Sequence, residues 1–288
     1  MGYTNDPVPQ YVYNHGPPDT LQIFSIKVEC NLGEMDGLCW PLHVFGLIAL
    51  RDSIDQHRNV IFNRTRDDCQ IITKHDPYLV LTGPTRAVVM NDATIPVTME
   101  AALTVKSTDG SLYKYLIFEA GALPSEFPSC TFDLIGGDRK LKLKIALARV
   151  VASVEATIFI RVLNGTWPIG FSGQLAAFSQ GISRKKKIVL AEFGDDGPIT
   201  DNSNLDLSRF VVSVESFGDL VVCCKAWRGE ERMEDDVMFK AEKKGKSCAT
   251  LTIDCTIGSC TLEVLVAWSP IRPVCEELVS VSEMVYAK

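Results

Sequence analysis

Two clusters of cations are the residues whose type and spacing could contact phosphate groups. The first cluster comprises Arg58, Arg64 and Arg66, and the second comprises Arg184, Lys185, Lys186 and Lys187. Each follows a Trp-Pro block and occupies a polar stretch, and guanidinium and ammonium groups donate hydrogen bonds to phosphate oxygens. Aromatic residues, which stack on bases in single-strand recognition, are not interleaved with either cluster. The clusters are therefore candidate contacts for a partner or for RNA, with a solvated loop as the simpler alternative.

Residues for catalysis are scarce. The four histidines are His15, His43, His57 and His75, and no Gly-x-Ser-x-Gly turn accompanies them as in serine hydrolases. No Walker loop is present. We expect no catalytic residues, although the sequence does not exclude an enzyme.

Metal and cofactor sites are equally weak candidates. Cys248, Cys255 and Cys260 lack the ligand spacing of a zinc site. Loop carboxylates such as Asp52 and Asp55 could bind calcium, but they follow no ordered spacing, and the corresponding positions further along the chain are Ser179 and Ser183. We expect no metal and no cofactor, and calcium stays an open question.

Short alternating runs of apolar residues must position these side chains. Residues 21–28, 141–149 and 262–268 alternate between apolar and other residues, which indicates strands with one buried face. Cys223 and Cys224 lie side by side in another such run, so their side chains should point to opposite faces.

The chain also contains a repeat. WPLHVFGLIAL (40–50) matches WPIGFSGQLAA (167–177), with tryptophan, proline, glycine and alanine at the same spacing. Weaker matches follow in the same order: 79–89 with 205–214, 103–106 with 222–225, 117–120 with 238–241, and 143–148 with 262–267. One of them pairs Arg86 with Arg209. Gly46 and Gly173, which lie inside strand patterns, predict a bulge or a close approach of the backbone.

These patterns predict an all-β protein of two tandem antiparallel β-sandwich modules related by internal duplication. We expect a flexible Pro-rich tail over 1–19, module 1 over 20–149 and module 2 over 150–288. A length of 288 residues suits two domains.

Charge and hydropathy limit the partners. The net charge is -7, so the chain as a whole lacks the basic footprint of a general nucleic-acid binder. No apolar run approaches the ~20 residues that span a bilayer, and the polar N-terminus is not typical of a signal peptide. We therefore expect a cytoplasmic protein with no membrane partner.

One long string carries a family resemblance: RDSIDQHRNVIFNRTRDDCQIITKHDPYLVLTGPTR (51–86). With SVEATIFIRV (153–162), LSRFVVSVE (207–215) and LVAWS (265–269), it resembles a plant domain of unknown function common in grasses. That domain occurs alone and as the C-terminal extension of jasmonate-induced ribosome-inactivating proteins. The resemblance covers about residues 20–270 and implies a stress- or defence-related setting, without catalytic residues to carry over.

Two functions follow as hypotheses. The first is a non-catalytic binding or regulatory module that engages a protein or ribonucleoprotein partner. The alternative is an RNA- or ribosome-directed enzyme, similar to an rRNA N-glycosidase. The sequence disfavours the alternative, because no arginine has a glutamate three residues before it.

Overall fold

The computed structural model describes residues 4, 16–30, 40–55, 57–90, 96–106, 113–123, 129–135, 141–182, 186–255 and 258–271. All regular elements among them are strands. The first nine are β1 (Asp19–Cys30), β2 (Leu42–Arg51), β3 (Asn59–Arg64), β4 (Gln70–Ile72), β5 (Val88–Met90), β6 (Thr98–Lys106), β7 (Tyr113–Ala122), β8 (Ser129–Ile135) and β9 (Leu141–Val150). The other ten are β10 (Ser153–Gly165), β11 (Ser172–Ser179), β12 (Ile188–Phe193), β13 (Thr200–Asp201), β14 (Asn204–Leu205), β15 (Val211–Glu215), β16 (Asp219–Arg228), β17 (Glu231–Lys240), β18 (Gly245–Cys255) and β19 (Gly258–Ser269).

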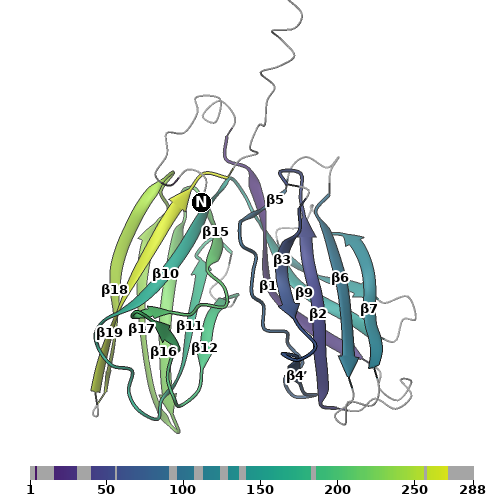
Figure 1. Cartoon of the computed structure of the whole chain (residues 1–288). Coiled ribbons are helices and arrows are strands. Elements are labelled where there is room, and N and C mark those ends of the chain that lie inside the picture. Colours follow the sequence, from purple (N-terminus) through teal and green to yellow (C-terminus); the bar gives the residue numbers. More distant parts are fainter. Residues whose placement is uncertain are drawn as a thin grey trace, which may run out of the picture.

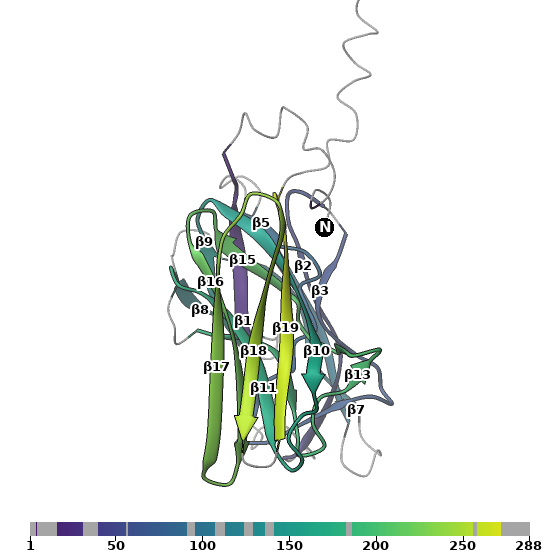
Figure 2. The same cartoon turned by 90° about the vertical axis from the view of Figure 1, so that its left-hand side faces the viewer.

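The strands form two sandwiches that stand side by side (Figure 1). In the first, the sheet β5-β1-β9-β8 packs on the sheet β3-β2-β6-β7, and β4 pairs with β2. In the second, the sheet β13-β14-β10-β19-β18, with β15 also on β10, packs on the sheet β12-β11-β16-β17. The second sandwich is seen from its outer side in Figure 2. The all-β prediction is confirmed, and none of the described residues forms a helix that could cross a membrane.

Alternation of side chains fills two separate cores. In β6 every second residue is buried, and Met99, Leu103 and Val105 reach the core on one face. One cluster of buried apolar residues draws on residues 21–147 and a second on residues 154–268. Each sandwich therefore has its own hydrophobic core.

The strands connect in the same order in both sandwiches. β5-β1-β9-β8 corresponds to β15-β10-β19-β18, and β3-β2-β6-β7 corresponds to β12-β11-β16-β17. A duplication requires this shared order, while common descent itself stays a prediction. The predicted match of 103–106 with 222–225 is wrong. Leu103 pairs with Gly46, but the residue that pairs with the matching Gly173 is Ala226 and not Val222. Alternation is unchanged by a shift of four residues, so the sequence could not fix this register. The match of 117–120 with 238–241 is also wrong, because Ile117 pairs with Leu103 whereas Met233 pairs with Ala226.

Gly46 lies at a close approach of the backbone, as predicted, whereas Gly173 is packed closely by two side-chain rings. A Cβ on Gly46, whose φ is +123°, would lie 2.2 Å from the main-chain oxygen of Ala102. A Cβ on Gly173 would lie 2.3 Å from the Phe193 ring and 2.5 Å from the Trp167 ring. The Trp167 ring thus covers Gly173, whereas the nearest atoms to a Cβ on Gly46 belong to the neighbouring strand β6.

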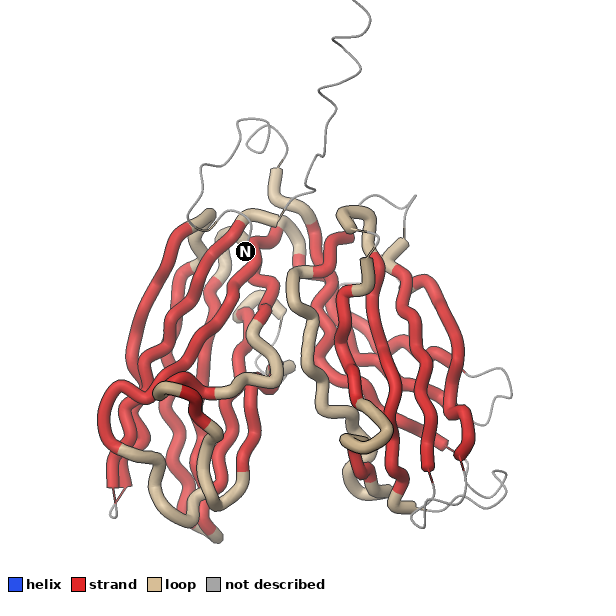
Figure 3. The backbone as a smooth tube through the Cα atoms, in the orientation of Figure 1, coloured by secondary structure: helices blue, strands red, loops and turns tan. Residues whose placement is uncertain are grey.

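Many loops lie at the ends of the sandwiches, but the connection between β4 and β5 does not. The connection between β4 and β5 runs along the flank of the first sandwich that faces the second, as the long tan segment in Figure 3 shows. Leu79 N donates to Ile26 O of β1 (3.0 Å) and Thr82 N donates to Ile61 O of β3 (2.7 Å). This connection therefore joins the two sheets of the first sandwich and lines the space between the sandwiches.

Candidate functional site

The sandwiches meet where β1 faces β12 and β15. The register of β1 against β9 shifts between Ile23 and Ser25, which leaves Phe24 as a bulge. A bulge changes the face to which the extra residue points. Phe24 accordingly packs against the core of the second sandwich, and the Lys186 ammonium lies 5.5 Å from the centre of its ring.

The Arg209 side chain reaches from the second sandwich into the first. It follows β14, is 3% exposed, and reaches three main-chain oxygens of the first sandwich. Nε donates to Gly83 O (2.8 Å), Nη2 to Ile23 O (2.6 Å) and Nη1 to Phe24 O (3.3 Å). Burial lowers the pKa of the guanidinium to about 10. Carbonyl dipoles, two of them at the β1 bulge, hold this cation.

Arg86, the arginine paired with Arg209 in the sequence repeat, has a partner within its own sandwich. Its Nη1 and Nη2 donate to the buried Asp52 carboxylate at 2.6 and 2.9 Å. Asp52 also accepts from Val89 N at 2.9 Å. The corresponding residue at the end of β11 is Ser179, whose buried hydroxyl has no hydrogen-bond partner among the residues that the structure describes. Without a carboxylate at that position, Arg209 bonds to the neighbouring sandwich.

Further polar contacts fix the junction. Gln22 Oε1 accepts from Ser213 N of β15 (3.0 Å), and the hydroxyls of Thr20 and Ser153 lie 2.8 Å apart. A two-residue turn, residues 151–152, is the only link between β9 and β10. Buried hydrogen bonds with definite partners specify one geometry, so the two sandwiches are held in one relative orientation.

Glu155 adds a buried carboxyl to this junction. Its Oε2 accepts from Ala87 N of the first sandwich at 2.7 Å. Burial raises the pKa of the Glu155 carboxyl above its usual range, against the opposing effects of this hydrogen bond and of Arg86. The group is therefore less readily charged than an exposed glutamate.

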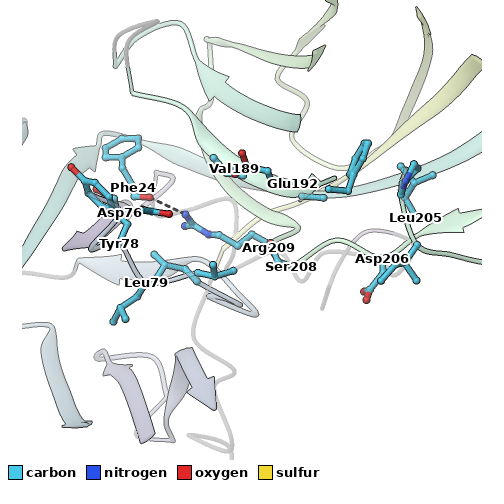
Figure 4. A pocket seen from close by; sticks show the side chains of 17 residues that line it. Phe24, Asp76, Tyr78, Leu79, Val189, Glu192, Leu205, Asp206, Ser208 and Arg209 are labelled. Carbon is cyan, nitrogen blue, oxygen red and sulfur yellow. Dashed lines mark hydrogen bonds between the residues drawn. The ribbon is translucent and has the colours of Figure 1, made fainter. Parts of the chain in front are cut away.

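A groove of about 480 Å³ opens between the sandwiches next to Arg209 (Figure 4). One wall is the β4–β5 connection and the other is formed by β12 and the segment 198–209. Apolar side chains remain open to solvent here, with Tyr78 and Val80 each 47% exposed and Ile199 78% exposed. Three carboxylates also line the groove: Asp76, Glu192 and Asp206. The groove therefore combines apolar and acidic character.

The groove wall is rigid at the main-chain level. Gln70 donates from Nε2 to Tyr78 O (2.9 Å) and accepts from Val80 N at Oε1 (2.9 Å). Tyr78 O and Val80 N are thus already hydrogen-bonded within the protein, which leaves the side chains of these residues as the contacts offered to a ligand. The Ser208 hydroxyl of the groove donates to Leu190 O (2.9 Å). This arrangement offers contacts for binding.

The first predicted cationic cluster is divided by the fold. Arg58 precedes β3 and donates to Glu100 (2.7 Å), whereas Arg64 ends β3 and donates to Asp68 (2.7 Å). A strand of six residues separates them by about 20 Å. Arg66 lies beyond Arg64, and its main-chain oxygen accepts from Lys106 (3.1 Å). The structure does not bring these three arginines together as one phosphate site.

The second cluster is only partly described, because Arg184 and Lys185 lie outside the described residues. Lys186 lies over Phe24 at the junction. Lys187 lies 5.5 Å from the centre of the Phe178 ring, 3.2 Å from Cys223 Sγ and 3.6 Å from Glu234. Both described lysines therefore contact the protein itself.

Metal ligands do not converge within the described ranges, where no group of three or more His, Cys, Asp or Glu residues could hold an ion. Of the calcium candidates, Asp52 is engaged by Arg86 and main-chain amides, and Asp55 accepts from His57 (2.8 Å).

Sequence reasoning did not identify the groove or Arg209 as site features. One signal was present: Ser179 replaces Asp52 at the matched position while the arginine is retained. An arginine that loses its local carboxylate needs another partner when it is buried. That mismatch could have indicated a contact between the modules.

Comparison with known proteins places most of the chain in one family. Residues 20–266 match the family model described as "Domain of unknown function (DUF6598)". No curated protein matches the chain. Among solved structures, a two-domain structure of extended synaptotagmin 2, which contains its first and second C2 domains, is similar. The identity is 6% over 94% of this chain and 97% of that chain, with a TM-score of 0.29. That score supports no conclusion about this protein. Because the family model spans far more than half of the chain, the protein belongs to the DUF6598 family of domains of unknown function.

Proposed function

We propose that the protein is a non-catalytic binding or regulatory module that holds a segment of a protein partner in the groove between its sandwiches. The segment carries apolar side chains flanked by lysine or arginine. The observation that carries this proposal is the exposure of Tyr78, Val80 and Ile199 in a groove bordered by carboxylates. Concave sites with apolar walls and a few polar groups are typical of ligand binding.

Charge complementarity favours a basic partner. Asp76, Glu192 and Asp206 lie in the groove, and the chain carries a net charge of -7. The cationic Arg209 in the same region is buried and bonded to carbonyl oxygens, so it does not compete for an acidic ligand. A basic segment would gain long-range attraction during encounter as well as local contacts.

The junction supports a preformed site. Phe24 and Arg209 fix both walls before a partner arrives, so ordering of the site adds little entropic cost to binding. We place this activity in the cytoplasm of a plant, in a stress- or defence-related setting. The resemblance to the grass domain associated with ribosome-inactivating proteins supports that setting, and a ribonucleoprotein that displays a basic protein segment would be a suitable partner.

Short fluorescent peptides test the proposal. Two leucines flanked by lysines should bind about tenfold more tightly than the same leucines flanked by glutamates, as judged by fluorescence anisotropy, because exposed charge pairs contribute up to about 1 kcal/mol each. Val80→Ser and Ile199→Ser should each weaken binding about fivefold through lost apolar contact. Ile169→Ser, at an 86% exposed position outside the groove, should leave binding unchanged.

Two results would reject this function. In one, no peptide of the series binds, or binding is insensitive to both groove variants. In the other, the purified protein depurinates or cleaves ribosomal RNA and one point mutation abolishes that activity, which would make it an enzyme.

A further inference from the structure

Three loops at one end of the second sandwich are joined by main-chain hydrogen bonds. They are the turn 151–152 after β9, the loop 216–218 after β15 and the loop 241–244 after β17. Ser216 N donates to Ala152 O (2.9 Å), and Ala241 N donates to Gly218 O (3.0 Å). We call these loops and their adjoining lysines the lysine tip. It lies away from the groove and shares no residue with it.

The lysine tip exposes apolar side chains. Phe217 is 90% exposed, and Val151 on the neighbouring loop is 56% exposed. A single exposed apolar residue needs no explanation. Here two of them lie on neighbouring loops that the hydrogen bond from Ser216 N to Ala152 O joins, so both are exposed at the same end of the sandwich.

Four exposed lysines lie on the β17–β18 hairpin, which is hydrogen-bonded to the loop that carries Phe217: Lys240, Lys243, Lys244 and Lys246. Among the described residues, no ion pair joins any of these four to a carboxylate. The carboxylates nearby are Glu215, Asp219, Glu242 and Asp19. Glu242 accepts from the Ser247 hydroxyl (2.8 Å), and Asp19 accepts from Ala152 N (2.8 Å) and is paired with the adjoining Arg149, so cations remain in excess. The tip is therefore a local cationic region on a chain whose net charge is -7.

We infer that the lysine tip docks onto an anionic phospholipid bilayer, with Phe217 inserted among the headgroups and the four lysines next to lipid phosphates. Aromatic side chains are favoured at the interface between water and hydrocarbon. Each lysine near an anionic leaflet adds about fivefold to binding. The absence of a membrane-spanning segment in the sequence does not bear on this peripheral contact.

Two features favour a lipid surface over RNA. Sequence-tolerant RNA binding uses several aromatic side chains as successive stacking platforms, whereas the described part of this tip presents the single aromatic ring of Phe217. Val151, beside it, offers apolar surface that a bilayer can bury and a nucleotide chain cannot stack on. The acidic remainder of the protein would be repelled by the same bilayer, which orients the molecule tip first.

Co-sedimentation of the full chain with vesicles tests this inference. Vesicles of phosphatidylcholine with phosphatidylserine should bind the protein, and vesicles of phosphatidylcholine alone should bind it at least tenfold less. Lys243→Ser with Lys244→Ser should reduce binding about 30-fold. Phe217→Ser should reduce it about tenfold, as expected from loss of buried aromatic surface.

Matched variants at the opposite end provide the control. Ile169→Ser removes an 86% exposed apolar side chain from the β10–β11 loop, and Lys74→Ser with Arg232→Ser removes two exposed cations elsewhere. These variants should bind vesicles as the unmodified chain does, and their circular dichroism spectra should match those of the tip variants.

The inference is overturned if anionic vesicles do not bind the protein or if control and tip variants lose binding equally. It is also overturned if the tip mutations weaken binding to a polyuridine oligonucleotide but leave vesicle binding unchanged. None of these results bears on the peptide groove, because the tip variants retain every residue that lines it.

Discussion

Replacing Arg209 with methionine should loosen the junction between the two sandwiches. The guanidinium donates three hydrogen bonds to main-chain oxygens of the first sandwich, two of them at the β1 bulge. Methionine fills similar space but donates none, so Gly83 O, Ile23 O and Phe24 O lose this donor while they stay largely buried. The second sandwich keeps its own core, since Arg209 lies outside that cluster.

The magnitude follows from two opposing contributions. Hydrogen bonds from a charged donor contribute about 2 kcal/mol each, or about 6 kcal/mol for three. Burial lowers the pKa of Arg209 to about 10, so the charged form is disfavoured by about 3 kcal/mol, a cost that methionine avoids. The expected loss in free energy of unfolding is therefore about 3 kcal/mol. Because Arg209 is protonated in both folded and unfolded chains below this pKa, the loss should be constant from about pH 5 to 9.

Urea unfolding, followed by tryptophan fluorescence, measures this loss. Arg209→Lys should not rescue stability, because an ammonium keeps the cost of a buried charge without the forked donors that reach separated carbonyls. Arg232→Met, at an exposed position on β17, is the matched control. A value for Arg209→Met within about 0.5 kcal/mol of the unmodified protein, or full rescue by lysine, would refute the reasoning.

Three other perturbations give distinct outcomes. In urea titrations, Glu155→Gln should gain stability relative to the unmodified protein as pH rises from 4 to 8. Burial raises the pKa of Glu155, so the stabilising contribution of its protonated form is lost as pH rises through that pKa. A stability difference that stays constant with pH would contradict this prediction. Gly46→Ala should lower the free energy of unfolding by about 3 kcal/mol or more because its Cβ meets a main-chain oxygen, whereas Gly194→Ala, with open space around it, should change it little. Iodoacetamide should leave Cys223 and Cys224 unmodified until urea is added, as read by mass spectrometry of the peptide that contains them. Both thiols are buried, and burial raises the pKa of Cys224. Modification of either thiol in the native protein would disprove their buried placement.

The strands could be predicted from sequence because alternation is a local property. Residues 262–268 alternate cleanly and fall within β19, where Leu262, Val264 and Val266 are fully buried. The register between strands that are distant in the sequence was harder to predict. Alternating residues fit equally well after an even shift, which is why the predicted match of 103–106 failed.

The junction and the groove depend on contacts that no local pattern encodes. The apolar residues in the run at 21–28 move from odd to even positions at Ile23 and Phe24, which marks the bulge, but nothing in the run indicates that Phe24 packs against the other sandwich. Arg209 bonds to an oxygen 186 positions away in the sequence, and main-chain acceptors carry no residue signature. The lysine tip was missed for a related reason, because only the fold brings Phe217 next to the hairpin that contains Lys243 and Lys244.

The contact between the sandwiches is not repeated at the corresponding place in the second sandwich. The contact is heterologous: one sandwich supplies the bulged β1, and the other supplies Arg209. Unlike a twofold contact, such an arrangement can propagate head to tail into a filament when every unit carries both halves. Here β10, which takes the place of β1 in the second sandwich, runs against β19 without a register shift from Glu155 to Val162. The part of β10 that corresponds to the bulge of β1 is therefore regular, and propagation through this contact is closed at that position.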